Sequence, residues 1–298
     1  MSQTHLPDRY VVMGNPVEHS KSPRIHALFA QQTGEPLEYG RLCPAVEAFE
    51  QEALAFFADG GRGANVTVPF KLRAFALASK LSPRAMAAGA VNTLRQDASG
   101  IYGDNTDGVG LVRDIEVNLQ RPLGGQRILL LGAGGAAQGV VLPLLERGPA
   151  QLTIANRTAA TAQALASRFA AAAASAALAG TAAAVAACTL TGGGPQQIEP
   201  QAYDIIINAT AGSLDGALPE CDERAFGPGT LAYDMMYSAQ PTVFMQHARA
   251  LGARAEDGLG MLVEQAAEAF FVWRDKRPDS APVLKLLRDE MRASGGAV

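Results

Sequence analysis

A short apolar run that leads directly into a glycine-rich turn constrains the fold more than any other part of this sequence. Residues 127–131 read RILLL, and the turn GAGGAA follows over residues 132–137. An unbroken apolar run is typical of a strand buried on both faces, and the G-x-G-x-x-A spacing opens a helix against a bound dinucleotide. The segment therefore predicts the strand, turn and helix of a dinucleotide-binding unit, with an ordinary glycine-rich turn as the alternative. The candidate cofactor-binding residues here are Gly132, Ala133, Gly134, Gly135, Ala136 and Ala137.

The end of the next expected strand decides which dinucleotide is predicted. It reads Ala-Asn-Arg-Thr over residues 155–158, and no Asp or Glu occurs between Glu146 and Glu199. A cofactor without a 2′-phosphate usually needs a carboxylate at this strand end, whereas an arginine can grip a phosphate. The sequence therefore predicts NADP, with Asn156, Arg157 and Thr158 as further binding residues. A solvated surface arginine is the alternative for Arg157.

Strand-like and helix-like segments alternate along the chain in two series. The first series runs from about residue 10 to residue 102, the second begins at residue 127, and the chain becomes helical after Gly258. Such alternation predicts an α/β fold with mostly parallel sheets. A length of 298 residues, with 48% hydrophobic residues, favours two domains, each with its own core.

Composition excludes several classes of protein. The 25 basic and 29 acidic residues give a formal net charge of −4, which does not favour nucleic-acid binding. No stretch is long and apolar enough to predict a membrane span, and the N-terminus lacks the pattern of a signal peptide. Three widely spaced cysteines and four scattered histidines predict neither a disulfide framework nor a metal site. We therefore expect a cytoplasmic protein that does not bind a membrane.

Two serines precede a helix near the N-terminus. Ser20 and Ser22 stand just before Pro23, a residue suited to the first turn of a helix. Ser22 could be the helix N-cap, and two hydroxyls at a helix N-terminus could also hold a substrate carboxylate. Both interpretations stay open from the sequence.

A second group of polar residues follows strand-like runs in the first half of the chain. Asn65 and Thr67 alternate with valines, and Lys71 begins the next helical segment. Asn92 ends an apolar run, and Asp107 precedes another helix, which it could simply cap. A lysine and an aspartate suit alcohol oxidation, because the hydroxyl proton must be removed as hydride leaves the carbon. We therefore predict that Lys71 and Asp107 form a proton-transfer pair. The sequence does not decide which of them is the base.

The chain resembles shikimate dehydrogenases along nearly its whole length. The resemblance rests on the ordered motifs GNPVEHSKSP, ANVTVPFK, AGAVNTL, GDNTDG, LLGAGGAA, ANRT, INAT, YDMMY and DGLGMLVEQAA. It implies a substrate-binding catalytic domain of residues 1–107 and 258–298, a Rossmann-type NADP-binding domain of residues 108–257, and a substrate cleft between them. It also implies reversible NADPH-dependent reduction of 3-dehydroshikimate to shikimate, in aromatic amino-acid and chorismate biosynthesis.

The resemblance also assigns roles to single residues. Lys71 and Asp107 would be catalytic, Ser20 and Ser22 would bind the substrate carboxylate with Tyr237 nearby, and Met235 and Gly258 would lie near the nicotinamide. The full set of implied substrate-binding residues is Ser20, Ser22, Asn65, Thr67, Lys71, Asn92, Asp107, Tyr237 and Gln265.

Departures from the family pattern keep alternatives open. Thr161 stands where many NADP-using members carry a second arginine, which would weaken discrimination against NAD, and AGSLDG replaces a serine-rich segment after INAT. The alternatives are a quinate/shikimate dehydrogenase with relaxed substrate or NAD use, and a non-catalytic shikimate-sensing regulator. A homodimer is a further possibility that the sequence leaves open.

Overall fold

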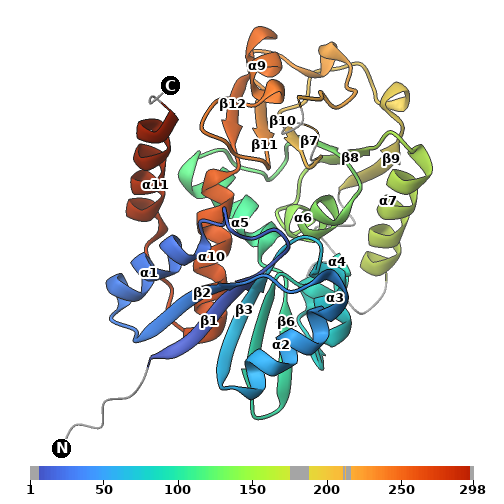
Figure 1. The fold of residues 1–298 in the computed structure, drawn as a ribbon. Coiled ribbons are helices and arrows are strands. Elements are labelled where there is room, and N and C mark those ends of the chain that lie inside the picture. The colour runs from blue at the N-terminus through green and yellow to red at the C-terminus, as the bar shows by residue number, and fades with distance from the viewer. Residues whose placement is uncertain (1–6, 175–187, 211, 213–215, 296–298) are drawn as a thin grey trace, which may run out of the picture. The chain divides into compact units, whose positions relative to one another are not determined.

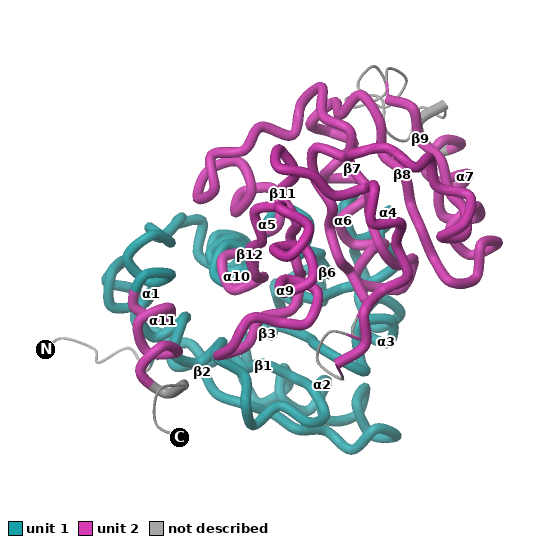
Figure 2. The backbone as a smooth tube through the Cα atoms, turned by 90° about the horizontal axis from the view of Figure 1, so that it is seen from above, with its two compact units in different colours: residues 1–110, 263–285 teal, residues 111–262, 286–298 magenta. Residues whose placement is uncertain are grey.

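The computed structural model describes residues 7–174, 188–210, 212 and 216–295. The chain divides into two compact units, which Figure 2 colours separately. Unit 1 comprises residues 1–110 and 263–285, and unit 2 comprises residues 111–262 and 286–298. The expected division placed all of residues 258–298 in the first domain, whereas here residues 258–262 and 286–298 group with unit 2. The binding roles expected of the two domains stay predictions.

Unit 1 contains a mixed six-stranded sheet with the order β2-β1-β3-β5-β6-β4 (Figure 1). β1 pairs in parallel with β2 and β3, and β4 pairs in parallel with β6, whereas β5 is antiparallel to β3 and β6. β5 and β6 form a hairpin that turns at the exposed residues Ala98 and Ser99. The strands are β1 (Asp8–Met13), β2 (Leu37–Leu42), β3 (Gly61–Val66), β4 (Lys80–Leu81), β5 (Thr93–Asp97) and β6 (Gly100–Asp104).

The helices of unit 1 begin and end where the sequence supplies the appropriate residues. Pro23 stands in the first turn of α1, and Gly34 ends that helix in the left-handed conformation with a φ of 69°. Ser82 caps α4 by accepting a hydrogen bond from the backbone N–H of Ala85. These helices are α1 (Ser22–Thr33), α2 (Phe49–Ala58), α3 (Lys71–Leu77) and α4 (Pro83–Ala88), with the short 3₁₀ segment η1 (Val46–Ala48) before α2.

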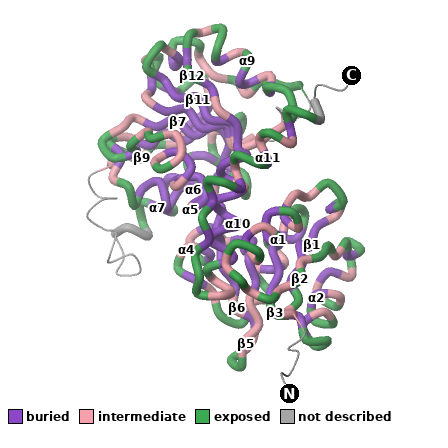
Figure 3. The backbone as a smooth tube through the Cα atoms, turned by 90° about the vertical axis from the view of Figure 1, so that its left-hand side faces the viewer, coloured by how far each residue is buried: buried purple, intermediate pink, exposed green. Residues whose placement is uncertain are grey.

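Unit 2 contains a six-stranded sheet with the order β12-β11-β10-β7-β8-β9, and every recorded pairing in it is parallel. The apolar runs of β7 and β10 are buried, as strands covered on both faces require. Figure 3 shows the burial of β7 in purple. The strands are β7 (Arg127–Leu131), β8 (Gln151–Ala155), β9 (Thr189–Gly193), β10 (Ile205–Asn208), β11 (Leu231–Asp234) and β12 (Arg254–Asp257).

Helices connect the parallel strands of unit 2, as the expected α/β alternation requires. The helices are α6 (Gly135–Leu145), α7 (Ala159–Ala174) and α9 (Val243–Ala250), with short 3₁₀ segments η4 (Pro195–Gln197) and η6 (Glu223–Ala225). The chain leaves unit 1 within α5 (Asp107–Arg113), which a π-helical turn, η2 (Asp114–Asn118), follows. The last two helices, α10 (Leu259–Arg274) and α11 (Ser280–Gly295), each contribute residues to both units.

Candidate active site

Lys71 and Asp107 form a close ion pair in unit 1. The Lys71 Nζ lies 2.6 Å from the Asp107 Oδ2, and the two side chains are 28% and 12% exposed. Each residue is the first of a helix, Lys71 of α3 and Asp107 of α5. The predicted proton-transfer pair is therefore brought together, and it remains partly accessible to a ligand.

The Asp107 carboxylate is oriented by Asn92. The Asn92 Nδ2 donates to the Asp107 Oδ1 at 2.8 Å and to the Thr106 Oγ1 at 3.0 Å. The Asn92 Oδ1 accepts from the backbone N–H of Thr106 at 2.9 Å, which fixes the other end of the amide. Gln265 of α10 joins the same network, because its Oε1 lies 3.4 Å from the Asn92 Nδ2 and 3.3 Å from the Thr106 Oγ1. Asn92, Asp107 and Gln265, which are far apart in the sequence, thus form one buried polar cluster.

Asn65 lies beside this cluster on β3, and its amide is held from both ends. Its Oδ1 accepts from the Tyr39 hydroxyl at 2.7 Å and contacts the His26 Nε2 at 3.2 Å. Its Nδ2 donates to the Asn92 carbonyl oxygen at 3.3 Å and to the Thr93 Oγ1 at 3.2 Å. Such a side chain is fixed in one orientation, because any rotation would leave buried donors and acceptors unpaired.

His26 supports Asn65 and Tyr39 from inside the core of unit 1. Its ring stacks on the Tyr39 ring with a centroid distance of 4.3 Å and is fully buried. Burial lowers the pKa of His26 to about 3, against a raising effect of its hydrogen bond to Asn65. The imidazole is therefore neutral at physiological pH, and since Asn65 presents an oxygen, its Nε2 carries the proton.

The two serines of the N-terminal motif occupy different environments. Ser22 is buried and hydrogen-bonds to the Tyr39 side chain, whereas Ser20 is partly exposed and its Oγ accepts from the Ser22 backbone N–H at 3.3 Å. Ser22 as N-cap is wrong, because Lys21 is the N-cap of α1 and provides no side-chain cap. The Ser22 hydroxyl hydrogen-bonds to Tyr39 instead of capping the helix. Thr67, the remaining predicted substrate residue of unit 1, directly follows β3 and is partly exposed.

The glycine turn of unit 2 leaves room for a ligand. Gly132 has a φ of 106°, which favours glycine, and a Cβ there would lie 3.2 Å from the Thr210 Cγ2. At Gly134 and Gly135 a Cβ would meet no atom within 4 Å, so the space beside them is open. Gly134 caps α6 without a side-chain hydrogen bond, which leaves the helix N-terminus to an anion. This turn fits a dinucleotide pyrophosphate.

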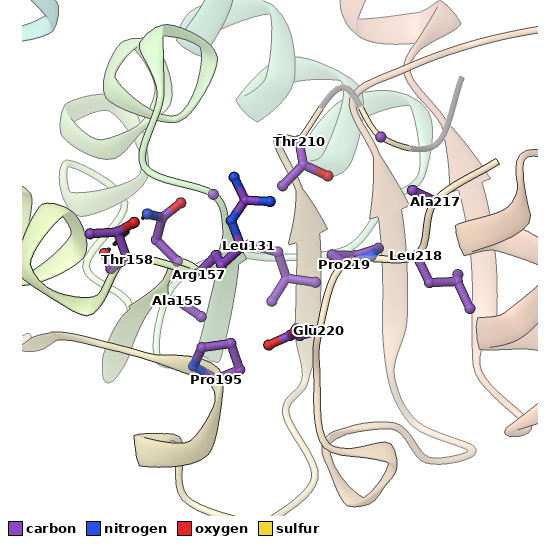
Figure 4. A pocket seen from close by; sticks show the side chains of 13 residues that line it. Leu131, Ala155, Arg157, Thr158, Pro195, Thr210, Ala217, Leu218, Pro219 and Glu220 are labelled. Atoms are coloured by element: carbon purple, nitrogen blue, oxygen red, sulfur yellow. Dashed lines mark hydrogen bonds between the residues drawn. The ribbon is translucent and has the colours of Figure 1, made fainter. Parts of the chain in front are cut away.

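A pocket of about 380 Å³ adjoins this turn at the carboxyl ends of the parallel strands (Figure 4). The predicted residues Asn156, Arg157 and Thr158 line it, and the Asn156 Nδ2 donates to the Thr158 carbonyl oxygen at 3.1 Å. A ligand in an open α/β sheet binds at this edge. The other lining residues are Leu131, Gly132, Ala155, Pro195, Thr210, Gly212, Ala217, Leu218, Pro219 and Glu220.

The last three predicted residues lie elsewhere in unit 2. Met235 and Gly258 are neighbours, because a Cβ at Gly258 would collide with the Met235 carbonyl oxygen. The Gly258 N–H donates to the Met236 carbonyl oxygen at 3.0 Å, which brings β11 and β12 together at their ends. Tyr237 follows β11, and burial raises the pKa of its hydroxyl.

Several residues of these sites were not among the predicted ones, and Thr106, His26, Tyr39 and Glu220 are the polar or charged examples discussed next. Thr106 stands inside the predicted GDNTDG turn, so its position beside Asn92 was the most accessible from the sequence. His26 and Tyr39 lie in ordinary amphipathic segments, and no local pattern marks them. Glu220 reaches the pocket from a loop more than 60 residues after Arg157, so spacing could not reveal it.

Family models match most of the chain in the expected order. Residues 12–94 match the shikimate dehydrogenase substrate binding domain, residues 116–189 match shikimate / quinate 5-dehydrogenase, and residues 258–288 match the shikimate 5′-dehydrogenase C-terminal domain. A shikimate dehydrogenase (NADP(+)) of Cupriavidus pinatubonensis is 54% identical over 290 residues, which cover 96% of this chain and 95% of the relative. The chain belongs to the shikimate dehydrogenase family.

Solved structures of similar proteins have the same fold. An Ael1 enzyme from Pseudomonas putida is 45% identical with a TM-score of 0.85, covering 94% of this chain and 98% of that protein. Shikimate 5-dehydrogenase from Thermus thermophilus, solved in complex with NADP(H) and shikimate, is 30% identical with a TM-score of 0.79, covering 95% and 99%. The predicted family and α/β fold class are confirmed, and the predicted activity and cofactor agree with the names of these relatives.

Two further observations concern other kinds of site. Among the described residues, no helix is long and apolar enough to cross a membrane. In the same parts of the chain, no group of three or more His, Cys, Asp or Glu side chains is arranged to hold a metal ion.

Proposed function

We propose that this protein is an NADP-dependent shikimate dehydrogenase that interconverts 3-dehydroshikimate and shikimate. The observation that carries the proposal is the partly exposed Lys71–Asp107 pair, with a nitrogen-to-oxygen distance of 2.6 Å, set among amide and hydroxyl groups. Shikimate carries a carboxylate and several hydroxyls, which such groups bind. The names of the relatives support the same substrate.

The substrate would be held by donors and acceptors from unit 1. Tyr237 stays a further predicted substrate-binding residue. Ser20 and Ser22 would bind the carboxylate. Asn65, Thr67, Asn92 and Gln265 would bind the hydroxyls. The amides of Asn65 and Asn92 are oriented by the protein itself, so a ligand would meet preformed donors and acceptors rather than rotating ones.

Lys71 would exchange the proton with the reacting oxygen. The ammonium has three donors, and its contact with Asp107 uses one of them. Asp107 accepts from Asn92 through its second oxygen, so the carboxylate orients Lys71 and stabilises its positive charge. During reduction Lys71 would donate a proton to the carbonyl oxygen, and during oxidation it would accept one from the hydroxyl.

The cofactor would be held by unit 2. The open space beside Gly134 and Gly135 fits a pyrophosphate, and Asn156, Arg157 and Thr158 would bind the adenosine 2′-phosphate. Met235 and Gly258 would lie near the nicotinamide. NADP, when bound, supplies the hydride acceptor or, in its reduced form, the hydride donor.

A four-way assay tests the activity: shikimate and quinate are each combined with NADP and NAD, and reduced nicotinamide is followed by absorbance. Fast reduction with shikimate and NADP supports the proposal. Comparable rates with quinate, which the matched family model also names, would make the protein a quinate/shikimate dehydrogenase. No turnover in any combination, with shikimate still raising the melting temperature, would indicate a sensor.

A pair of lysine variants tests the role of Lys71. Lys71→Met should lower kcat by roughly 10²- to 10⁴-fold, the range for loss of a proton-transfer group, while NADP binding measured by calorimetry stays unchanged. Lys80→Met removes the same charge at an exposed position of β4 and should leave kcat unchanged. Equal activity of the two variants would refute the assignment.

The remaining expectations concern where the protein acts and in what state. We propose that it works in the cytoplasm, where NADPH is available and where its three free cysteines, Cys43, Cys188 and Cys221, would stay reduced. The homodimer stays a prediction, and light scattering during size-exclusion chromatography checks it.

A further inference from the structure

The cofactor pocket of unit 2 contains an acidic side chain opposite its basic one. Arg157 and Glu220 are the only charged residues among the described residues that line it. Arg157 lies two residues after the end of β8, whereas Glu220 lies in the loop between β10 and β11. Figure 4 shows Glu220 on the side of the pocket that Pro195 lines, with Arg157 above it in this view. The pocket is therefore polarised, with one positive and one negative wall.

Both charged groups are available to a ligand. Arg157 and Glu220 are exposed, and within the described parts of the chain neither takes part in a recorded ion pair or hydrogen bond. Glu220 therefore does not neutralise Arg157 through a direct ion pair. A carboxylate at the wall of a ligand pocket, without a partner among the described residues, can select what binds there.

The two cofactors differ at the 2′ position of the adenosine ribose, which carries a phosphate in NADP and a hydroxyl in NAD. The two charged walls of the pocket act on these groups in opposite ways. A phosphate has only acceptor oxygens at neutral pH and is attracted by Arg157 but repelled by Glu220. A ribose 2′-hydroxyl has a proton that a carboxylate accepts, which is how dinucleotide sites usually bind NAD. In such sites the acid follows the second strand, whereas Asn156 and Arg157 follow that strand here.

We propose that Glu220 is a specificity-determining residue that favours the unphosphorylated cofactor, so that the protein uses NAD as a second cofactor. The inference rests on the proposed function, because it concerns the cofactor of that reaction. Preference for NADP then reflects the balance between Arg157 and Glu220 rather than the arginine alone.

Two variants with the same charge change test this role. Glu220→Gln keeps the shape of the side chain and removes its charge, and Glu223→Gln does the same at a nearby exposed position that does not line the pocket. Calorimetry gives the affinities of each protein for adenosine 2′,5′-bisphosphate and adenosine 5′-monophosphate, which isolate the adenosine half. Reduced-nicotinamide absorbance gives kcat/KM for NADP and NAD.

Glu220→Gln should raise the preference for the bisphosphate over the monophosphate by about tenfold, the effect of losing one charged hydrogen bond. The ratio of kcat/KM for NADP over NAD should rise by a similar factor, with KM for shikimate unchanged, and Glu223→Gln should change neither ratio. An unchanged preference in Glu220→Gln would overturn the proposal. An equal loss of affinity for both ligands would overturn it too, because Glu220 would then contact the adenine or another group that both ligands share. If the unaltered protein does not turn over shikimate, the proposed function is refuted. The affinities for adenosine 2′,5′-bisphosphate and adenosine 5′-monophosphate would still test the role of Glu220.

Discussion

The Asn92 amide nitrogen lies 2.8 Å from one carboxylate oxygen of Asp107, and Lys71 contacts the other oxygen at 2.6 Å. The pairing of β5 with β6, which sets Thr93 opposite Asp104, brings the ends that carry Asn92 and Asp107 together. Each oxygen of the Asp107 carboxylate therefore has its own partner, Asn92 for one and Lys71 for the other. Asn92 acts on the proton-transfer pair through Asp107 as well as binding substrate in our proposal.

Replacing Asn92 should affect turnover more than cofactor affinity. Asn92→Ala removes the donor to Asp107 and leaves the buried N–H of Thr106 unpaired, so we expect kcat to fall at least tenfold and the free energy of unfolding to fall by about 1–3 kcal/mol. Steady-state kinetics and urea unfolding measure these effects. An increase in KM for shikimate at unchanged kcat would show that Asn92 only binds substrate.

Arg157 should discriminate between the two nicotinamide cofactors. Arg157→Ala removes the only basic group among the described pocket-lining residues, so the KM for NADP should rise at least tenfold while the KM for NAD changes little. Initial rates with each cofactor at saturating shikimate check this. Equal increases for both cofactors would contradict a phosphate contact.

Two glycine substitutions should separate cofactor binding from folding. Gly134 has a φ of −77° and open space beside it, so Gly134→Ala should leave the melting temperature unchanged but weaken NADP binding at least tenfold. Gly132 has a φ of 106°, so Gly132→Ala should cost about 1 kcal/mol or more in stability. Thermal unfolding and NADP titration compare the two variants. Normal NADP affinity in Gly134→Ala would show that the pyrophosphate lies elsewhere.

Buried His26 should make stability depend on pH. Its pKa is about 3 in the folded protein and near 6.5 when unfolded, so between these values the unfolded state binds more protons. The contribution of the neutral His26 side chain to the free energy of unfolding is complete above pH 6.5. It is lost as the pH falls toward 3, by up to about 1.4 kcal/mol per pH unit. His26→Gln lacks this dependence, so the difference in unfolding free energy between the two proteins should narrow from pH 7 to pH 5. Parallel pH profiles in urea unfolding would contradict the prediction.

Sequence patterns predicted the elements that local chemistry controls. The run RILLL and the turn after it became β7 and the start of α6. Lys71 begins a helix directly after Pro69 and Phe70, as its position behind a strand-ending proline indicates. Each of these features depends on a few neighbouring residues, so one sequence suffices to predict it.

Features that depend on distant contacts could not be predicted from the residues alone. A helix cap was one of the two interpretations of Ser22, and nothing local indicates that its hydroxyl would hydrogen-bond to Tyr39 instead of capping α1. The support of Asn65 by His26 needs β3 and α1 to meet, and Glu220 reaches its pocket through the connection after β10. Strand order decides these contacts, and strand order is a property of the whole unit.

The hairpin of β5 and β6 turns at Ala98 and Ser99, at the opposite end of the ladder from Asn92. Extra residues inserted at this exposed tip would lengthen the loop without shifting the strand pairing that aligns Asn92 with Asp107. The tip is therefore a suitable attachment point for a peptide tag or reporter. The candidate site lies at one end of the hairpin, and the exposed turn at the other end can be lengthened.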